Sequence, residues 1–427
     1  MKTQSALVLL WAGFLQSALS DCLWNLSVET PTVDCRLRIL DFRRNSSASV
    51  PGLKAVQALN VECSDVFFFE SQLRSDHFGT LEHLNDLSIK FCKIRQLPPR
   101  SFVGLSKLKR LTINTYNADW TALVLQPDYE AFVGLDKLEI LDLTENNIEK
   151  LPPGLLCPLK SVRTVNLSLN SLQDLEDLAL SERSDSACDI PIETLILGRN
   201  ELKSVPPGSL ALLGQIKHLD LSFNQLGVLV ESTFDKLTNL EVLDLSHNKL
   251  VSLPPQIFSL TLNLKELQLS NNTIGTIDIN AFTNLTDLQI LNLSGNSLDE
   301  NWIKSGIFNG LRSLIVLDLS SNHISKIESK LLVDLSALQM LNLAHNQIHT
   351  ISSNAFASQI NLHVLLMSHN QLESLHHQTL TGLSVLSSIA LDHNKLHSLH
   401  QEALKNCTNL KELSLSNNFL TQVISLK

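Results

Sequence analysis

One short phrase of residues returns along most of the chain, from Leu138 to Leu420. It reads Leu-x-x-Leu-x-Leu-x-x-Asn-x-Leu, and a clear copy runs from Leu240 to Leu250. Successive copies of its asparagine are 24 residues apart, except for one step of 30 residues and one of 26. The asparagines are Asn146, Asn170, Asn200, Asn224, Asn248, Asn272, Asn296, Asn322, Asn346, Asn370, Asn394 and Asn418. A single compact domain does not impose such a period, so we expect an array of stacked repeats.

This phrase is the signature of a leucine-rich-repeat solenoid, an α/β-type horseshoe. The leucines of Leu-x-Leu alternate with other residues and therefore face one side of a short strand. Strands stacked at about 4.8 Å form a parallel β-sheet, here predicted on the concave face, and their leucines close over a continuous core. An asparagine amide both donates and accepts hydrogen bonds. A column of asparagines is thus expected to satisfy the backbone where the chain turns inward.

The convex face is predicted to consist of irregular turns. Four repeats carry a proline pair after the last leucine, and proline favours an extended run over a helix. These pairs are Pro98-Pro99, Pro152-Pro153, Pro206-Pro207 and Pro254-Pro255. A second apolar column is expected to back the core, formed by Phe102, Phe132, Phe234, Phe258, Phe282, Phe308 and Phe356, with leucine at Leu210, Leu332, Leu380 and Leu404.

The ends of the chain do not follow the repeat. Residues 1–20 combine a lysine, a short apolar run and small residues before Asp21, which predicts a cleaved signal peptide and entry into the secretory pathway. Residues 21–53 are expected to form a disulfide-tied N-terminal cap. Residues 54–427 hold about 14 clear repeats and one degenerate repeat, without a C-terminal cap or an apolar run of membrane-spanning length. We therefore expect a fragment of a longer protein or a short secreted form.

The motifs argue against an enzyme. The sequence contains no G-x-S-x-G elbow, no Walker loop, no H-E-x-x-H and no C-x-x-C pair. We expect no catalytic residue, no cofactor and no metal. The net charge of −10 argues against nucleic acid as a partner.

Six of the seven cysteines have expected disulfide partners. The predicted pairs are Cys22–Cys35 in the cap, Cys63–Cys92 between stacked strands, and Cys157–Cys188 beside a long repeat. Cys407 takes a place in the repeat that Leu237 and Leu285 occupy elsewhere, so we expect a buried free thiol.

Seven N-x-[ST] sequons predict glycosylation in a secreted protein. They are Asn25, Asn45, Asn166, Asn271, Asn284, Asn292 and Asn406. Asn166 and Asn292 belong to the repeat phrase itself, so they are expected to point onto the concave face. Glycans there would push a partner toward an edge, a loop or the convex side.

Two long repeats carry loops that add nothing to the core, over residues 117–130 and 173–190. Insertions of this kind are where binding surfaces are added to a scaffold. The candidate ligand-contact residues are Trp120, Tyr129, Glu182 and Arg183. The alternative is that both loops are tolerated decoration.

Three histidines recur at the position before the ladder asparagine: His345, His369 and His393. Strand stacking is expected to place them about 5 Å apart. One hypothesis is a pH switch, because protonation would set like charges against each other. The alternative is a position that accepts any polar residue.

Several stretches are not generic repeat sequence. They are Cys63 to Phe78, Cys92 to Leu105, Asn117-Ala-Asp-Trp120, Leu156-Cys157-Pro158-Leu159 and Asn301-Trp302. Together they resemble the start of the ectodomain of the long insect-type Toll receptors, the 18-wheeler and Tollo branch in particular. The resemblance covers the chain from about Cys22 onward.

This resemblance implies a single-pass receptor of the cell surface, acting in innate immunity and developmental patterning. It implies protein partners, either Spätzle-like cystine-knot cytokines or another Toll or leucine-rich-repeat receptor, and a possible receptor dimer. The transmembrane helix and the cytoplasmic TIR domain of such a receptor are absent from this sequence, so any membrane attachment would come from a missing C-terminal part. Two other hypotheses stay open: a secreted leucine-rich-repeat adhesion or matrix protein, and a soluble decoy that binds ligand without signalling.

Overall fold

The computed structural model describes most of the chain in two compact units, Met1–Glu201 (unit 1) and Leu202–Lys427 (unit 2). The described residues are 22–25, 30–40, 55–64, 70–75, 78–79, 81–115, 123–178, 188, 190–301, 306–399 and 402–421. The predicted signal peptide over residues 1–20 lies outside them. Among the described residues, none of the helical segments has the length and apolar character that crossing a bilayer requires.

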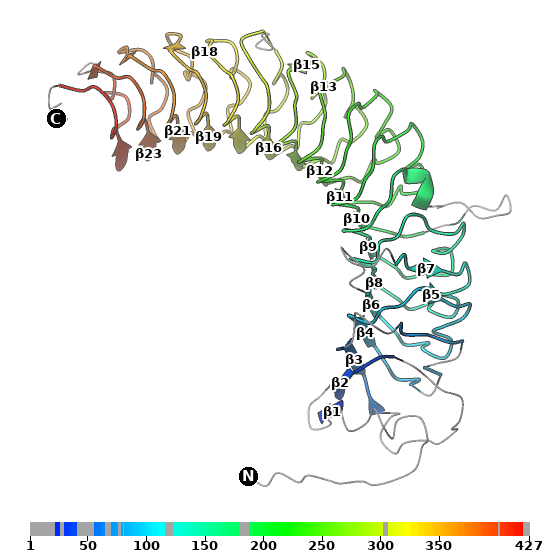
Figure 1. Ribbon diagram of the computed structural model, residues 1–427. Helices are drawn as coiled ribbons and strands as arrows, with labels where there is room; N and C mark the ends of the chain where they lie inside the picture. Colours follow the sequence, from blue (N-terminus) through cyan, green and yellow to red (C-terminus); the bar gives the residue numbers. More distant parts are fainter. Residues whose placement is uncertain are drawn as a thin grey trace, which may run out of the picture. The chain divides into compact units, whose positions relative to one another are not determined.

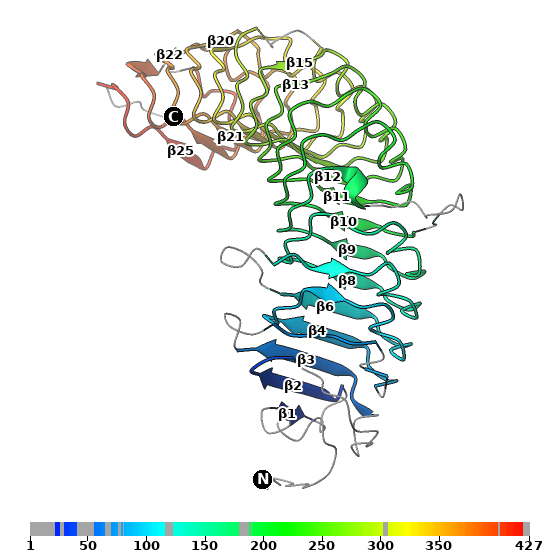
Figure 2. The ribbon, with the colours of Figure 1, turned by 45° about the vertical axis from the view of Figure 1, so that its right-hand side comes forward.

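The main sheet of unit 1 is a ladder in which each strand pairs with the strand of the next repeat (Figures 1 and 2). Its first pair, β1 with β2, is antiparallel and places Cys22 opposite Cys35. The later pairs are parallel. The strands are β1 (Cys22–Asn25), β2 (Thr32–Leu37), β3 (Ala58–Cys63), β4 (Asp86–Lys90), β6 (Arg110–Asn114), β8 (Ile140–Asp142), β9 (Thr164–Asn166) and β10 (Thr194–Ile196).

The main sheet of unit 2 is parallel in every described pair. Each strand residue pairs with the equivalent residue of the adjacent repeat, so Leu243 pairs with Leu219 on one side and with Leu267 on the other. Its strands are β11 (His218–Asp220), β12 (Val242–Asp244), β14 (Glu266–Gln268), β16 (Ile290–Asn292), β17 (Val316–Asp318), β19 (Met340–Asn342), β21 (Val364–Leu366), β23 (Ser388–Ala390) and β25 (Glu412–Ser414). The leucine-rich-repeat solenoid predicted from the phrase is confirmed.

The opposite side of each repeat is more regular than the sequence predicts. Turns dominate it, as expected, and the described residues also include a short 3-10 helix, η3 (Leu175–Leu178). Four pairs of two-residue parallel strands also form there; in unit 2, β13, β15 and β18 lie on the outer side of the arc (Figure 1). They are β5 (Gln96–Leu97) with β7 (Gln126–Pro127), β13 (Ser252–Leu253) with β15 (Thr276–Ile277), β18 (Lys326–Ile327) with β20 (Thr350–Ile351), and β22 (Ser374–Leu375) with β24 (Ser398–Leu399).

The asparagine column satisfies the backbone of adjacent repeats, as predicted. In unit 1 the amide nitrogen of Asn170 donates to the carbonyl of Leu143 at 2.9 Å, and its oxygen accepts the N–H of Ile148 at 2.9 Å. The same amide donates to the carbonyl of Leu167 at 2.9 Å within its own repeat. The ladder asparagines from Asn146 to Asn394 are all buried. Water cannot reach the backbone groups around them, so the asparagine amides supply the hydrogen bonds that these groups need.

The second apolar column is a stack of parallel phenylalanine rings. In unit 2, Phe258 lies between Phe234 and Phe282, with ring centroids 5.8 and 6.4 Å away. In unit 1 the stack begins one repeat before the predicted column, because Phe78 lies 6.0 Å from Phe102. The leucines that replace phenylalanine elsewhere in the column are also buried.

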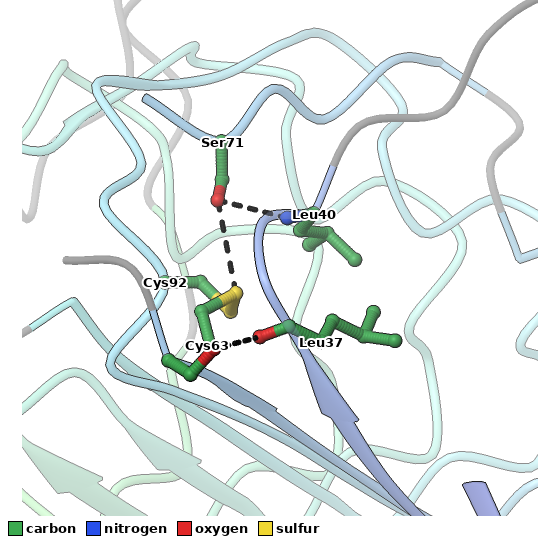
Figure 3. Close-up of a disulfide and its surroundings, with 6 residues drawn as sticks. Leu37, Leu40, Cys63, Ser71 and Cys92 are labelled. Carbon is green, nitrogen blue, oxygen red and sulfur yellow. Dashed lines mark hydrogen bonds between the residues drawn. A yellow bond between two sulfur atoms is a disulfide. The ribbon is translucent and has the colours of Figure 1, made fainter. Parts of the chain in front are cut away.

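Disulfides join the cysteines in the pairs expected from the sequence: Cys22–Cys35, Cys63–Cys92 and Cys157–Cys188. The second pair joins Cys63 at the end of β3 to Cys92, two residues past β4 (Figure 3). Beside it, the Ser71 hydroxyl accepts the N–H of Leu40 at 3.0 Å. This disulfide links two irregular early repeats whose ladder position holds Ser64 and Cys92 in place of asparagine.

Candidate binding face

The outward side chains of the main strands form the strand face of each unit. Most three-residue strands hold one buried residue between two half-buried ones, so two residues per repeat face outward; in β11 and β25 the first residue is exposed. Parallel register aligns these residues in columns along each sheet. The chemistry of the face is therefore set by residues that the core leaves unconstrained.

The strand face of unit 1 is mostly polar, and several of its charges are paired between neighbouring repeats. Arg110 donates to the Asp86 carboxylate, and this hydrogen bond raises the pKa of the guanidinium. At the edge of the same face, Lys109 lies 3.1 Å from Glu139, and Arg163 lies 3.2 Å from Glu193. Exposed ion pairs contribute about 0–1 kcal/mol each to the free energy of unfolding. Their main effect here is that the charges on this face largely cancel.

The strand face of unit 2 begins with acidic side chains. Asp220 and Asp244 occupy the same place on β11 and β12, and register sets them side by side. Burial raises the pKa of the Asp244 carboxyl, and the neighbouring Asp220 raises it further, against hydrogen bonds from Ser246 that lower it. Nearby, the Lys265 ammonium donates to Glu241 at 2.7 Å.

Farther along unit 2 the strand face turns apolar. Five half-buried side chains from four consecutive strands form this area, which we call the apolar strand patch: Val316, Met340, Val364, Leu366 and Ala390. Ile290 on the preceding strand pairs with Val316 at the margin of this area, whereas Ile140 in unit 1 stands beside Arg110. Partly exposed apolar side chains that cluster on a rigid sheet mark a surface suited to protein contact.

A histidine column runs along one edge of the apolar strand patch. The rings of His345 and His369 stack with centroids 4.2 Å apart, and those of His369 and His393 with centroids 4.1 Å apart. The predicted stacking is confirmed. Burial and the two flanking histidines lower the pKa of His369, while Asp392 opposes this effect.

The sequons occupy several sides of the repeats. Asn25, Asn271, Asn284 and Asn406 are exposed. Asn166 and Asn292 are half-buried on the strand face, and their oxygens accept the hydroxyl hydrogens of Ser168 and Ser294 at 2.8 and 2.7 Å. Asn45 lies outside the described residues. No sequon falls between residues 293 and 405, so the apolar strand patch lies in a sequon-free stretch.

The two long-repeat loops meet at one groove in unit 1. This groove has a volume of about 600 Å³, and its lining includes Val124, Gln126, Lys150 and Glu176. Val124 and Gln126 come from the end of the first loop, and Glu176 comes from η3 at the start of the second. Tyr129 is 44 % exposed but does not line the groove. Trp120, Glu182 and Arg183 lie outside the described residues.

Sequence reasoning missed the apolar strand patch, because its residues fall at the x positions of the repeat phrase. Their pattern becomes visible only when the strands are stacked in register. A signal was nevertheless present, since the residue before the central leucine is apolar in four consecutive repeats, at Ile290, Val316, Met340 and Val364. Cys407 is buried and unpaired, as expected, and burial raises the pKa of its thiol to about 11.

Comparison with known proteins gives the chain relatives among receptors. It is 34% identical over 229 residues to Toll-like receptor 7 of Drosophila melanogaster, covering 52% of this chain and 16% of that protein. It is 31% identical over 156 residues to Toll-like receptor 3 of Bos taurus, covering 36% of this chain and 17% of that protein. The chain thus spans about a sixth of the length of these curated relatives.

Solved structures share the fold. The TLR13–ssRNA13 complex superposes with a TM-score of 0.64 at 25% identity, covering 85% of this chain and 57% of that one. The Toll–Spatzle complex from Drosophila gives a TM-score of 0.63 at 22% identity, covering 85% and 55%. The family described as "Leucine rich repeat" matches residues 127–181, 191–250, 238–298, 302–348, 342–396 and 384–426. Repeat phrase, parallel ladder and family match agree, and the chain belongs to the leucine-rich-repeat family.

Proposed function

We propose that this chain is the extracellular ligand-recognition part of a Toll-type transmembrane receptor, of the 18-wheeler and Tollo branch, in innate immune and developmental signalling. It enters the secretory pathway through a signal peptide over residues 1–20. A cap over 21–53 covers the first strand, the repeats follow over 54–427, and glycans occupy the seven sequons. The ligand is a protein, a Spätzle-like cystine-knot cytokine or another cell-surface receptor. The similarity to Toll-like receptors and the three disulfides support this proposal.

The single observation that carries the proposal is the apolar strand patch. Four consecutive strands present apolar side chains to solvent, whereas the other described strands carry mostly polar side chains on this face. A ladder of buried asparagines holds these strands in place, so the patch binds without a large ordering cost. Its central side chains, Val364 and Leu366, are the expected binding hot spots because neighbours shield them on both sides.

The test is ligand binding by the secreted chain and two matched variants. Leu366→Glu puts a charge into the apolar strand patch, and Ile196→Glu puts the same charge at the same strand position in unit 1. Against a Spätzle-type cytokine in surface plasmon resonance, Leu366→Glu should weaken binding more than about tenfold, a loss of roughly 1.4 kcal/mol. Ile196→Glu should bind like the wild type.

Two outcomes would contradict parts of this proposal. If the folded wild-type chain binds no cystine-knot cytokine, this class of protein is ruled out as its ligand. Unchanged binding by Leu366→Glu, together with a loss in Lys150→Glu, would move the site to the groove between the two loops. Circular dichroism of each variant separates lost contacts from lost fold.

A secreted adhesion or matrix protein is the second candidate function. The observation that favours it is 32% identity over 132 residues to mouse podocan, covering 31% of this chain and 19% of that protein. A soluble decoy would bind the same ligand as the receptor but would not transmit a signal. Sequencing the 3′ end of the transcript discriminates: a frame that continues into a transmembrane helix and a TIR domain supports the receptor. A stop codon after Lys427 supports the secreted forms.

A further inference from the structure

We propose that His369, Asp392 and His393 form a binding site for one divalent transition-metal ion of the Zn²⁺ class, at the edge of the strand face of unit 2. The site goes beyond the proposed function, because it needs neither the ligand nor the receptor assignment. Its three residues come from two adjacent repeats.

The backbone conformation fixes the positions of the two histidine Cα atoms. His369 and His393 have φ of 55° and 54°, a left-handed conformation in which the following ladder asparagine is buried. The N–H of His369 donates to the carbonyl of Asp392 at 3.0 Å, which ties one repeat to the next at the site itself. Both imidazoles therefore project from neighbouring, rigidly spaced points of the same edge.

The three donor groups already lie close together. One ligand atom from each of His369, Asp392 and His393 lies within 4.8 Å of the others. Ligands of a tetrahedral zinc ion, with bonds of about 2.0–2.1 Å, are about 3.4 Å apart. The side chains must therefore close by no more than about 1.4 Å. One ring must also tilt out of the stack, because parallel rings cannot direct their lone pairs at the same point. Both histidine side chains are exposed to solvent.

The chemistry of the set suits a borderline transition metal. Two imidazoles and one carboxylate form a common ligand set for Zn²⁺, whereas Mg²⁺ and Ca²⁺ prefer oxygen alone. Imidazoles bind metal in their neutral form, so binding should be stronger at pH 7.5 than in acid. The Ser368 hydroxyl donates to the Asp392 carboxylate at 2.7 Å, which orients it as outer-shell partners of metal ligands do.

The two ends of the site offer further contacts. His345 stacks on the far side of His369 at 4.2 Å and lies outside this group, so the fourth position on the ion is left to water. At the other end, the Asn417 side-chain amide lies 2.9 Å from Nε2 of His393, and the tautomer of the ring decides which of the two donates. Within the described part of the chain, no other group of three histidine, cysteine or acidic residues reaches this proximity.

The test is zinc titration of the secreted chain carrying no histidine tag, by isothermal titration calorimetry at pH 7.5. The wild type should bind one ion per chain in a saturable transition. His369→Gln and Asp392→Asn should each weaken this binding at least about tenfold. His323→Gln is the matched control, since His323 is exposed on the adjacent edge position two repeats earlier and should leave the titration unchanged.

A mapping experiment guards against variants that fail to fold. Diethyl pyrocarbonate modifies accessible imidazoles, and mass spectrometry locates each modified residue. Zn²⁺ should protect His369 and His393 in the wild-type chain and leave His323 reactive. Equal protection of all histidines, or zinc titrations of His369→Gln and Asp392→Asn that match the wild type, would overturn the proposal. A wild-type chain that takes up no Zn²⁺ in a saturable step would overturn it as well.

Discussion

The side-chain oxygen of Asn272 accepts the backbone N–H of Leu250 at 3.0 Å, one repeat away. The amide nitrogen of the same asparagine donates to the carbonyls of Leu245 at 3.0 Å and Leu269 at 3.1 Å. One buried side chain thus connects the turns of two repeats. These turns would otherwise leave unpaired backbone groups in an apolar interior, which costs about 1–3 kcal/mol per group.

Replacing this asparagine tests how far the ladder stabilises the fold. Asn272→Ala should lower the free energy of unfolding by about 3 kcal/mol, because several buried groups lose their partner at once. Chemical denaturation with circular dichroism measures the loss. Asn280→Ala is the control, since Asn280 is exposed and its side chain should contribute little. Equal effects of the two changes would contradict the role assigned to the ladder.

The phenylalanine stack should be a second source of stability. Phe258 is fully buried between Phe234 and Phe282, so Phe258→Ala removes a ring that packs against both neighbours. We expect a loss of about 3–5 kcal/mol in the free energy of unfolding. Phe419 is 58% exposed, and Phe419→Ala should change stability far less. A small effect at Phe258 would mean that the turns can collapse into the space left behind.

Asp244 should make stability depend on pH in a defined direction. Its pKa is raised above the usual 3.8, so the folded state holds this proton more firmly than the unfolded state does. Its favourable contribution is present below pH 3.8 and disappears as the pH rises through the raised value, which leaves an unfavourable charge at pH 7.

Asp244→Asn should therefore raise the melting temperature at pH 7, and the gain should shrink toward pH 4. Asparagine keeps the hydrogen bond that Asp244 accepts from the N–H of Ser246 at 2.8 Å, since Asn292 accepts the same bond in its own repeat. Asp142→Asn is the matched control, because Thr112 and Asn166 flank Asp142 without adding an acid. Differential scanning fluorimetry across this pH range is the measurement. A gain that is the same at pH 4 and pH 7 would rule out the ionic cause.

Cys407 should be chemically silent in the folded chain. Burial raises the pKa of its thiol from 9.0 to about 11, so at pH 8 the thiolate fraction falls about a hundredfold. Iodoacetamide should label the folded chain very slowly and label the chain in guanidinium at one site, provided that the disulfides stay closed. Mass spectrometry counts the labels. Rapid labelling under native conditions would show that the last described repeats open easily.

The sequence predicts the repeating part of this molecule well because its energetics are local. A leucine, an asparagine or a phenylalanine at a fixed place in each repeat meets the same residue of the next repeat, so a one-dimensional pattern determines the packing. Phe78 was missed because its repeat lacks the phrase that locates the column. The two-residue strands β13 and β15 were missed because nothing in Ser252-Leu253 or Thr276-Ile277 signals pairing until the repeats are stacked.

The candidate site was less predictable, because function occupies the positions that the repeat leaves variable. The stacking of His345, His369 and His393 follows from their spacing and was predicted. The approach of Asp392 to that stack was not, since it depends on the side of the chain to which each residue points. The apolar strand patch combines residues from two columns, and only the register of β17, β19, β21 and β23 brings Met340 beside Val364 and Leu366 beside Ala390.

The left-handed residue before each ladder asparagine has a consequence for how such a chain can change. Leu169, Phe223 and Asn271 share almost the same φ there, 55°, 51° and 53°, although their side chains have nothing in common. The scaffold therefore dictates the backbone at this position and is indifferent to the side chain it carries. A substitution at this position changes the side chain of one repeat and leaves the strand register of its neighbours unchanged. The surface chemistry along this edge can therefore evolve one repeat at a time while the fold stays the same.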